Sequence, residues 1–243
     1  MRVLFFVFLL ACALSVPAKE MELKSAVDSN GFRYNYVTND PYNGREYTLP
    51  NGLKVYLSKI PVKPRITFKL AVLGGLADSP ADVTGLAHYF EHMMFKGTSK
   101  IGSLNYEKEK KLLDQIEKLF EERRKTTDPA RKAELYAQID KLSGEAAKLA
   151  SAGEYSRLIA SIGGMGLNAF TASDMTVYMV DIPSQELEKL LRLESERIHG
   201  PVMRLFHTEL ETVYEEFNRG QDSDSRIVFE ELSSKLFPTH PYG

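Results

Sequence analysis

The sequence "HYFEHMMF", residues 88–95, places two histidines four positions apart and a glutamate directly before the second. Residues four apart lie about one turn apart on the same face of an α-helix, so His88 and His92 can point imidazole nitrogens at one ion. Glu91 lies beside them. The stretch therefore predicts a metal-binding helix over residues 85–95, following a glycine-rich loop and an alternating strand at residues 65–75.

The residue types at these positions suit zinc chemistry. Catalytic Zn²⁺ commonly takes three protein ligands and keeps one position for water, and neutral imidazole is a favoured ligand. A metal-bound water loses its proton near neutral pH, and an adjacent carboxylate can accept that proton. This assigns Glu91 as a candidate general base and leaves one ligand to be found.

An acidic helix predicted at residues 208–219 supplies candidates for the third ligand. Glu209 and Glu216 are seven residues apart and share a face, whereas Glu215 is turned away from Glu216 by about 100°. Glu211 is a further acidic residue of this helix. Only one face can reach the metal, and the residues alone leave the choice open.

Alternating and helical patterns indicate the rest of the fold. Residues 47–60 predict a hairpin with positive φ at both Asn51 and Gly52, and residues 175–180 predict a strand. Two charged helices are predicted within residues 105–150, with a break at 127–129. Ser184 is predicted to cap a helix that ends at His199, and Thr208 with Glu211 fits a capping box. The mixture predicts an α+β fold with an antiparallel or mixed sheet packed with helices.

The composition and the amino terminus set further limits. The formal net charge is −2, from 31 basic and 33 acidic side chains, so no basic surplus indicates a nucleic-acid partner. Met1-Arg2, an apolar run at 3–14 and small residues at 16–18 predict a secretory signal over residues 1–18. We expect an exported, periplasmic protein without a stable membrane span after signal removal. Lipoprotein anchoring at Cys12, the single cysteine, is the minor alternative.

Four motifs together resemble one family. The stretches "GLAHYFEHMMFKGT", "LNAFTASDMTVY", "ELETVYEEF" and "PTHPYG" occur in the order found in the first domain of the pitrilysin (insulinase) family, whose members include insulysin and the mitochondrial processing peptidases. The resemblance covers most of residues 47–243. It implies one zinc ion per chain, held by His88, His92 and Glu216, with Glu91 as the general base.

The same resemblance implies supporting roles for other residues. Glu209 would orient the site as an acid that contacts a ligand rather than the metal. Asn168, Ala169, Phe170 and Thr171 would form a strand edge that pairs with the backbone of a peptide substrate. We expect that edge to favour extended chains over folded proteins.

The resemblance also shapes the expected domains. Residues 93–215 separate His92 from Glu216, which is longer than the family pattern, and the surplus is about the length of the charged segment 106–152. We therefore expect a zinc metallopeptidase amino-terminal domain over 45–243 with a helical-hairpin insertion at 106–152. Family members continue beyond this point, so we expect a truncated domain and a second pitrilysin-like domain in cis or as a separate subunit.

Two functions follow from the motifs. The first is a zinc-dependent endopeptidase that hydrolyses peptides or small unfolded proteins, and the alternative is a non-catalytic peptide-binding or assembly subunit of the same fold. A structural metal site would need a fourth protein ligand. No cysteine is placed to supply one, and His199, His207 and His240 have no partner at ligand spacing. The presence of His88, Glu91, His92 and Glu216 favours the enzyme.

Overall fold

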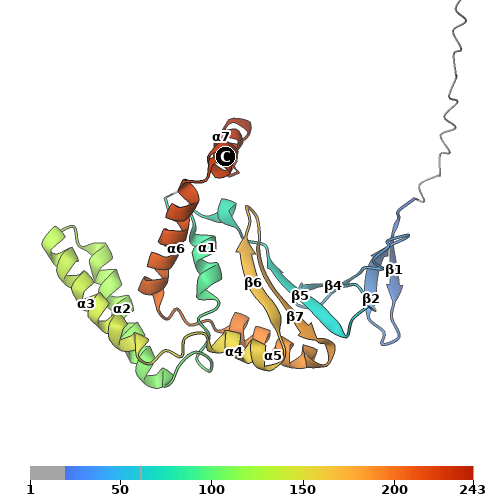
Figure 1. Ribbon diagram of the computed structural model, residues 1–243, viewed down its shortest axis with the longest axis horizontal. Helices are drawn as coiled ribbons and strands as arrows, with labels where there is room; N and C mark the ends of the chain where they lie inside the picture. The colour runs from blue at the N-terminus through green and yellow to red at the C-terminus, as the bar shows by residue number, and fades with distance from the viewer. Residues whose placement is uncertain (1–19, 61, 81, 243) are drawn as a thin grey trace, which may run out of the picture. The chain divides into compact units, whose positions relative to one another are not determined.

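The computed structural model describes residues 20–60, 62–80 and 82–242 (Figure 1). These residues fall into two compact units, the first ending at Lys63 and the second beginning at Pro64. The predicted secretory signal at 1–18, with Cys12, lies outside the described residues. Within the described ranges, no helix combines the length and the apolar composition that a membrane crossing requires.

The first unit is a four-stranded antiparallel sheet. Its strands follow the chain in the order β1 (Leu23–Val27), β2 (Arg33–Val37), β3 (Arg45–Thr48) and β4 (Lys54–Leu57). The hairpin predicted from residues 47–60 is confirmed as β3 and β4, which pair from Thr48 with Lys54 to Arg45 with Leu57. The strands β1 and β2 were not predicted, although Tyr34 and Tyr36 alternate with polar residues in β2.

The turn between β3 and β4 differs from the prediction. Gly52 has a φ of 87°, but Asn51 is not among the residues with positive φ. The N–H of Gly52 donates to the carbonyl oxygen of Leu49 at 2.9 Å, and the N–H of Leu53 donates to the Asn51 side chain at 3.1 Å. Pro50 suits the first central position of such a turn, so the loop needs only one left-handed position.

The second unit contains a three-stranded antiparallel sheet in the order β5 (Arg65–Val72), β7 (Thr176–Pro183) and β6 (Met165–Thr171). The predicted strand is confirmed as β7, where Thr176, Tyr178 and Val180 are buried. Val177 on the other face is buried as well, so burial alternates only from Tyr178 onward. β7 extends three residues beyond the prediction, to Pro183. β6 lies at one edge of the sheet and pairs only with β7 among the described strands.

Two helices pack on this sheet, α4 (Glu154–Ser161) and α5 (Leu187–His199) (Figure 1). Their buried side chains form one core with β7, made by Tyr155, Ile159, Val180, Ile182 and Leu190 together with Ile101. The prediction that Ser184 caps α5 is wrong. Ser184 begins a short 3₁₀ turn, and its N–H donates to the carbonyl oxygen of Pro64 at 3.0 Å. The short helix α4 was not predicted.

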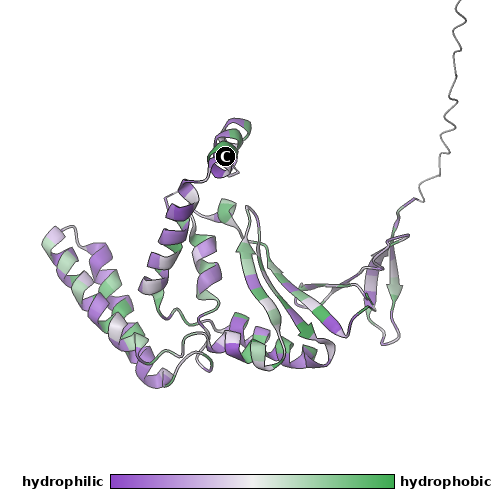
Figure 2. Cartoon of the chain, viewed as in Figure 1, coloured by the Kyte–Doolittle hydropathy of each residue, from purple (hydrophilic) through white to green (hydrophobic). Residues whose placement is uncertain are grey.

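The charged segment forms a helical hairpin of α2 (Tyr106–Lys125) and α3 (Pro129–Ala147), as predicted. Asp128 accepts a hydrogen bond from the N–H of Ala130 at 3.0 Å, and Pro129 occupies the first turn of α3. The apolar seam between the helices is built around buried Ile116, Ile139 and Ala146. Hydrophilic residues cover much of both helices in Figure 2. The identity of the hairpin as an insertion stays a prediction.

Three further helices complete the second unit: α1 (Leu86–Met93), α6 (Phe206–Gln221) and α7 (Asp224–Leu236). The predicted helix at 85–95 is confirmed as α1. α6 begins at Phe206, two residues earlier than predicted, so Thr208 lies inside its first turn and cannot be the N-cap. The capping-box prediction for Thr208 and Glu211 is therefore wrong. Helices and antiparallel sheets together confirm the predicted α+β class.

Candidate metal centre

The helix α1 presents its two histidines on one face. Gly85 starts the helix with a φ of 85°, a left-handed conformation that glycine adopts at no steric cost. Tyr89 and Met93, four residues apart, are buried at 6% and 1% exposure and fix the helix against the core. His88 and His92 are one residue earlier on the same turns, and their Nε2 atoms lie 3.3 Å apart.

A carboxylate from α6 completes the cluster. One carboxylate oxygen of Glu216 lies 3.4 Å from His92 Nε2 and 3.8 Å from His88 Nε2. The donor atoms of these three residues all lie within 4.8 Å of one another. α1 and α6 are neighbours in space although more than a hundred residues separate them in the chain (Figure 1).

The donor set fits a zinc ion. Tetrahedral zinc with bonds of about 2.0–2.1 Å to nitrogen and oxygen places neighbouring donors roughly 3.3–3.4 Å apart. The separations of 3.3 Å and 3.4 Å around His92 match that spacing, and the third separation of 3.8 Å is slightly longer. Two imidazoles and one carboxylate are also a ligand set of catalytic zinc sites.

Glu209 contacts one of the histidines. Its Oε1 lies 2.8 Å from His92 Nδ1, and Lys96 forms an ion pair with its other oxygen. Burial raises the pKa of the Glu209 carboxyl, but the hydrogen bonds from Lys96 and His92 outweigh burial and hold the pKa below its usual value. A carboxylate at this position keeps the proton of His92 on Nδ1 and leaves the Nε2 lone pair facing Glu216 and His88.

Glu91 lies between α1 and the sheet. Its side chain is only 7% exposed, and its Oε2 accepts a hydrogen bond from the Thr171 hydroxyl at 2.6 Å. Thr171 is the last residue of β6, and the neighbouring Thr176 hydroxyl donates to the carbonyl oxygen of Gly74 at 2.9 Å. The carboxylate of Glu91 is thus held at the end of the edge strand.

The predicted substrate residues form consecutive positions of that strand. Asn168, Ala169, Phe170 and Thr171 lie on β6 in register with β7, with Ala169 opposite Tyr178. Phe170 is 45% exposed, so it is not a core residue of the described chain. β6 runs beside α1 (Figure 1), and the hydrogen bond from Thr171 to Glu91 joins the end of the strand to that helix.

The remaining histidines lie elsewhere. His207 packs its ring 4.7 Å from that of Phe120, and His240 packs 4.5 Å from Tyr242. Neither belongs to the metal-binding cluster of the described residues, and neither does Glu211 or Glu215.

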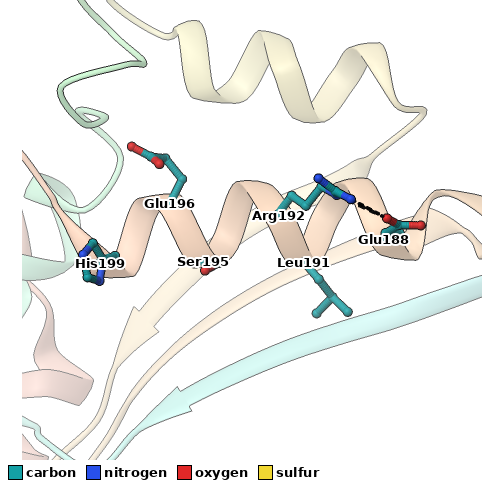
Figure 3. A pocket seen from close by; sticks show the side chains of 6 residues that line it. All are labelled: Glu188, Leu191, Arg192, Ser195, Glu196 and His199. Carbon is teal, nitrogen blue, oxygen red and sulfur yellow. Dashed lines mark hydrogen bonds and ion pairs between the residues drawn. The ribbon is translucent and has the colours of Figure 1, made fainter.

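His199 lies beside a shallow hollow of about 460 Å³ on the outside of α5 (Figure 3). All the residues that line it come from this one helix: Glu188, Leu191, Arg192, Ser195, Glu196 and His199. Arg192 pairs with Glu188 across one turn at 2.7 Å. An open surface of solvated side chains on one helix provides no converging groups, unlike the cluster formed by α1 and α6.

Some residues of the site were not found from the sequence. Lys96 lies three residues beyond the end of α1, and its partner Glu209 is far along the chain. Tyr89 donates from its hydroxyl to the carbonyl oxygen of Phe206 at 2.5 Å and so joins α1 to the first turn of α6. No local pattern marks either contact.

Comparison with known proteins identifies a family match and two peptidase relatives. Residues 54–127 and 139–243 match the family described as Insulinase (Peptidase family M16). The human insulin-degrading enzyme is 25% identical over 214 residues, covering 86% of this chain and 16% of that protein. An uncharacterised zinc protease of Mycobacterium leprae is 26% identical over 198 residues, covering 81% of this chain and 33% of that protein.

A solved structure resembles the fold. The first half of the periplasmic protease PqqL from Escherichia coli superimposes with a TM-score of 0.55 and 19% sequence identity, over 84% of this chain and 36% of that chain. The identity is too low to carry more than the fold. The chain spans a third or less of the length of the two curated relatives it matches.

Proposed function

Because the chain belongs to the insulinase family, peptidase family M16, we propose that it is the zinc-binding, amino-terminal part of an endopeptidase. Its substrates would be peptides or small unfolded proteins. The observation that carries the proposal is the convergence of His88, His92 and Glu216 next to the buried carboxylate of Glu91. One zinc ion per chain would occupy the cluster.

The residues have distinct tasks in this proposal. Bound zinc would supply a Lewis acid for the scissile carbonyl and lower the pKa of water to near neutrality. Glu91 takes the proton of the attacking water and later returns it to the leaving amine. The hydroxyl of Thr171 holds Oε2 of Glu91 in place, and Glu209 keeps His92 in the tautomer whose Nε2 is free.

The edge of β6 is the proposed substrate site. An extended peptide can add to a free sheet edge through backbone hydrogen bonds, which recognise chain conformation more than side-chain identity. The residues Asn168 to Thr171 lead directly to the Glu91 carboxylate. Cleavage should therefore be broad in sequence and poor on folded proteins.

The proposal includes a partner and a location. A second pitrilysin-like domain, in cis or as a separate subunit, would close over the site and exclude water from it. We also propose export to the periplasm, supported by the predicted signal at residues 1–18.

The main test separates zinc binding from turnover. In the presence of the second domain, Glu91→Gln should keep one zinc per chain and lower peptide hydrolysis by about 10²- to 10⁴-fold, because only the base is removed. His92→Ala should lose the metal as well. Glu215→Gln, an exposed glutamate of the same helix as Glu216, is the matched control and should change neither. Full hydrolysis by Glu91→Gln would exclude Glu91 as the base and favour the non-catalytic alternative.

A second test addresses the substrate edge. Ala169→Pro removes one backbone N–H from β6, so we expect KM to rise or cleavage to disappear while zinc stays bound. Thermal denaturation of the same variant measures any damage to the pairing of β6 with β7. An unchanged KM in a folded variant would show that substrate binds elsewhere.

A further inference from the structure

Glu216, the third metal-binding residue of the proposal, lies far along α6 from the start of that helix. Glu216 lies ten residues beyond Phe206, where α6 begins, which corresponds to about 15 Å along the axis. A tilt of roughly 10° at the first turn would move Glu216 by about 2.6 Å on this geometry. Metal–ligand distances hold within about 0.2 Å. The direction in which α6 starts therefore decides whether Glu216 meets the histidines.

The body of α6 provides little to fix that direction. None of its side chains from Phe206 to Gln221 is fully buried. The chain enters the helix through Leu205, which adopts a left-handed conformation with φ 57° and ψ 26°. A leucine holds this conformation only where surrounding contacts impose it. Within α6, the Tyr89 hydroxyl donates to the carbonyl oxygen of Phe206 and Glu209 contacts His92, but neither contact holds the chain before Leu205.

Arg204, directly before Leu205, makes such contacts and is 2% exposed. Its Nε and Nη2 donate to the two carboxylate oxygens of Glu109 at 2.8 Å and 3.2 Å. Nη2 also donates to the carbonyl oxygen of Thr98 at 2.8 Å, and Nη1 donates to those of Lys96 at 2.7 Å and Ile101 at 2.9 Å. All five N–H groups of the guanidinium are thus used.

The loop after α1 is shaped around this guanidinium. A Cβ on Gly97 would lie 2.2 Å from the carbonyl oxygen of Ile101 and 3.0 Å from Arg204 Nη1. A Cβ on Gly102 would lie 2.7 Å from the same nitrogen. Both glycines have positive φ, at 95° and 92°. Only glycine allows the backbone to approach Arg204 so closely from two sides.

Arg204 thereby joins three elements. Glu109, at 0% exposure, belongs to α2 of the helical hairpin. Lys96 follows α1, and while its carbonyl oxygen binds Arg204, its side chain pairs with Glu209, which in turn contacts His92. The end of α1, the start of α6 and the hairpin meet at one buried guanidinium.

We infer that Arg204, braced by Glu109 of the helical hairpin, is a positioning residue for the metal site: it fixes the start of α6 against the end of α1 and so sets the distance from Glu216 to His88 and His92. This inference rests on the proposed function. It also assigns a structural role to the helical hairpin, because Glu109 of α2 binds the guanidinium of Arg204.

The chain offers a matched control in a second buried pair of the same kind. Arg197 and Glu194, at 1% and 5% exposure, form an ion pair within α5. Arg197 lies against Tyr155 and Tyr178, and its hydrogen bond goes to Glu194 rather than to α6 or residues 96–102. Loss of either pair should destabilise the fold, but only the pair at Arg204 should affect α6.

The experiment compares Arg204→Lys and Glu109→Gln with Arg197→Lys and Glu194→Gln in the full chain. Zinc affinity is measured by competition with a chelator, and Tm is measured on the zinc-free proteins. We expect the first two variants to weaken zinc binding about tenfold or more, a range typical of groups that orient metal ligands. The control variants should lower Tm comparably and leave zinc affinity within about twofold of the wild type. Glu109→Gln, the milder change, decides the outcome where Arg204→Lys does not fold.

Amide hydrogen exchange on the zinc-free chain gives a readout that does not depend on the metal. Protection in the first turn of α6 should fall in Glu109→Gln and stay unchanged in Glu194→Gln. Equal zinc affinities in Glu109→Gln and Glu194→Gln, with equal exchange in α6, would overturn the inference. A wild-type chain that binds no zinc would instead overturn the proposed function, and the exchange comparison would still test the positioning role.

Discussion

The helices α1 and α6 both contribute residues to the candidate metal centre, yet they are held in different ways. α1 buries Tyr89, Glu91 and Met93 against the core, so its histidines are fixed along the length of the helix. α6 has no fully buried side chain, and its hydrogen bonds with α1 lie near its start, at Phe206 and Glu209. The difference teaches that one half of the site is placed by core packing and the other half by a few polar contacts.

The largest expected effect is on the free energy of unfolding, which should depend on side chains of α1 much more than on those of α6. Met93→Ala should lower the free energy of unfolding by about 2–5 kcal/mol, because it leaves a cavity at a position only 1% exposed. Leu210→Ala on α6, at 48% exposure, should change it by less than about 0.5 kcal/mol. Urea denaturation of both variants measures the difference. Equal losses would show that α6 is packed as firmly as α1.

A smaller effect should appear in metal affinity. Glu209→Gln keeps an oxygen near His92 Nδ1 but removes the charge that pairs with Lys96, so zinc affinity should fall about 10- to 100-fold. Glu211→Gln, two residues further along α6, is the control. Chelator competition measures the zinc affinity of both variants. An unchanged zinc affinity in Glu209→Gln would show that Glu209 does not help to position the metal-binding residues.

The smallest expected effect concerns pH. Burial lowers the pKa of His207, with Arg123 adding to it, while Asp140 and Glu211 act in the opposite direction. A depressed folded pKa means that stability is complete above the unfolded pKa, near about 6.5, and is lost as pH falls through the folded pKa. His207→Phe should therefore show a smaller decrease in Tm between about pH 7.5 and about pH 5.5. A decrease as large as in the wild type would assign the pH response to other groups.

The sequence predicted the features that depend on local periodicity. Helical spacing located the hairpin seam around Ile116 and Ile139, and the i, i+4 relation alone was enough to place His88 and His92 on one helix face. Glu216 emerged only through family resemblance, because the acidic helix alone offered several glutamates. The structure brings that residue, among the candidates, to the histidines.

The features that escaped prediction depend on contacts between distant segments. Arg204 and Glu109 are 95 residues apart, and no local sequence pattern around either residue predicts a buried ion pair. The start of α6 was misplaced because Thr208 and Glu211 satisfy a capping pattern. The hydrogen bond from Tyr89 to Phe206 and the left-handed Leu205 instead favour a helix that begins earlier.

The free edge of β6 has a consequence for handling the protein in solution. Charged residues and proline usually keep an unpaired strand from joining another copy, and the sequence of β6, MGLNAFT, contains neither. Its register irregularity lies between Met165 and Asn168, so residues 168–171 form a regular edge. Concentrated samples of the chain should therefore tend to self-associate through this strand. Extended peptides that occupy the edge should act as solubilising agents and delay turbidity in proportion to how much of β6 they cover.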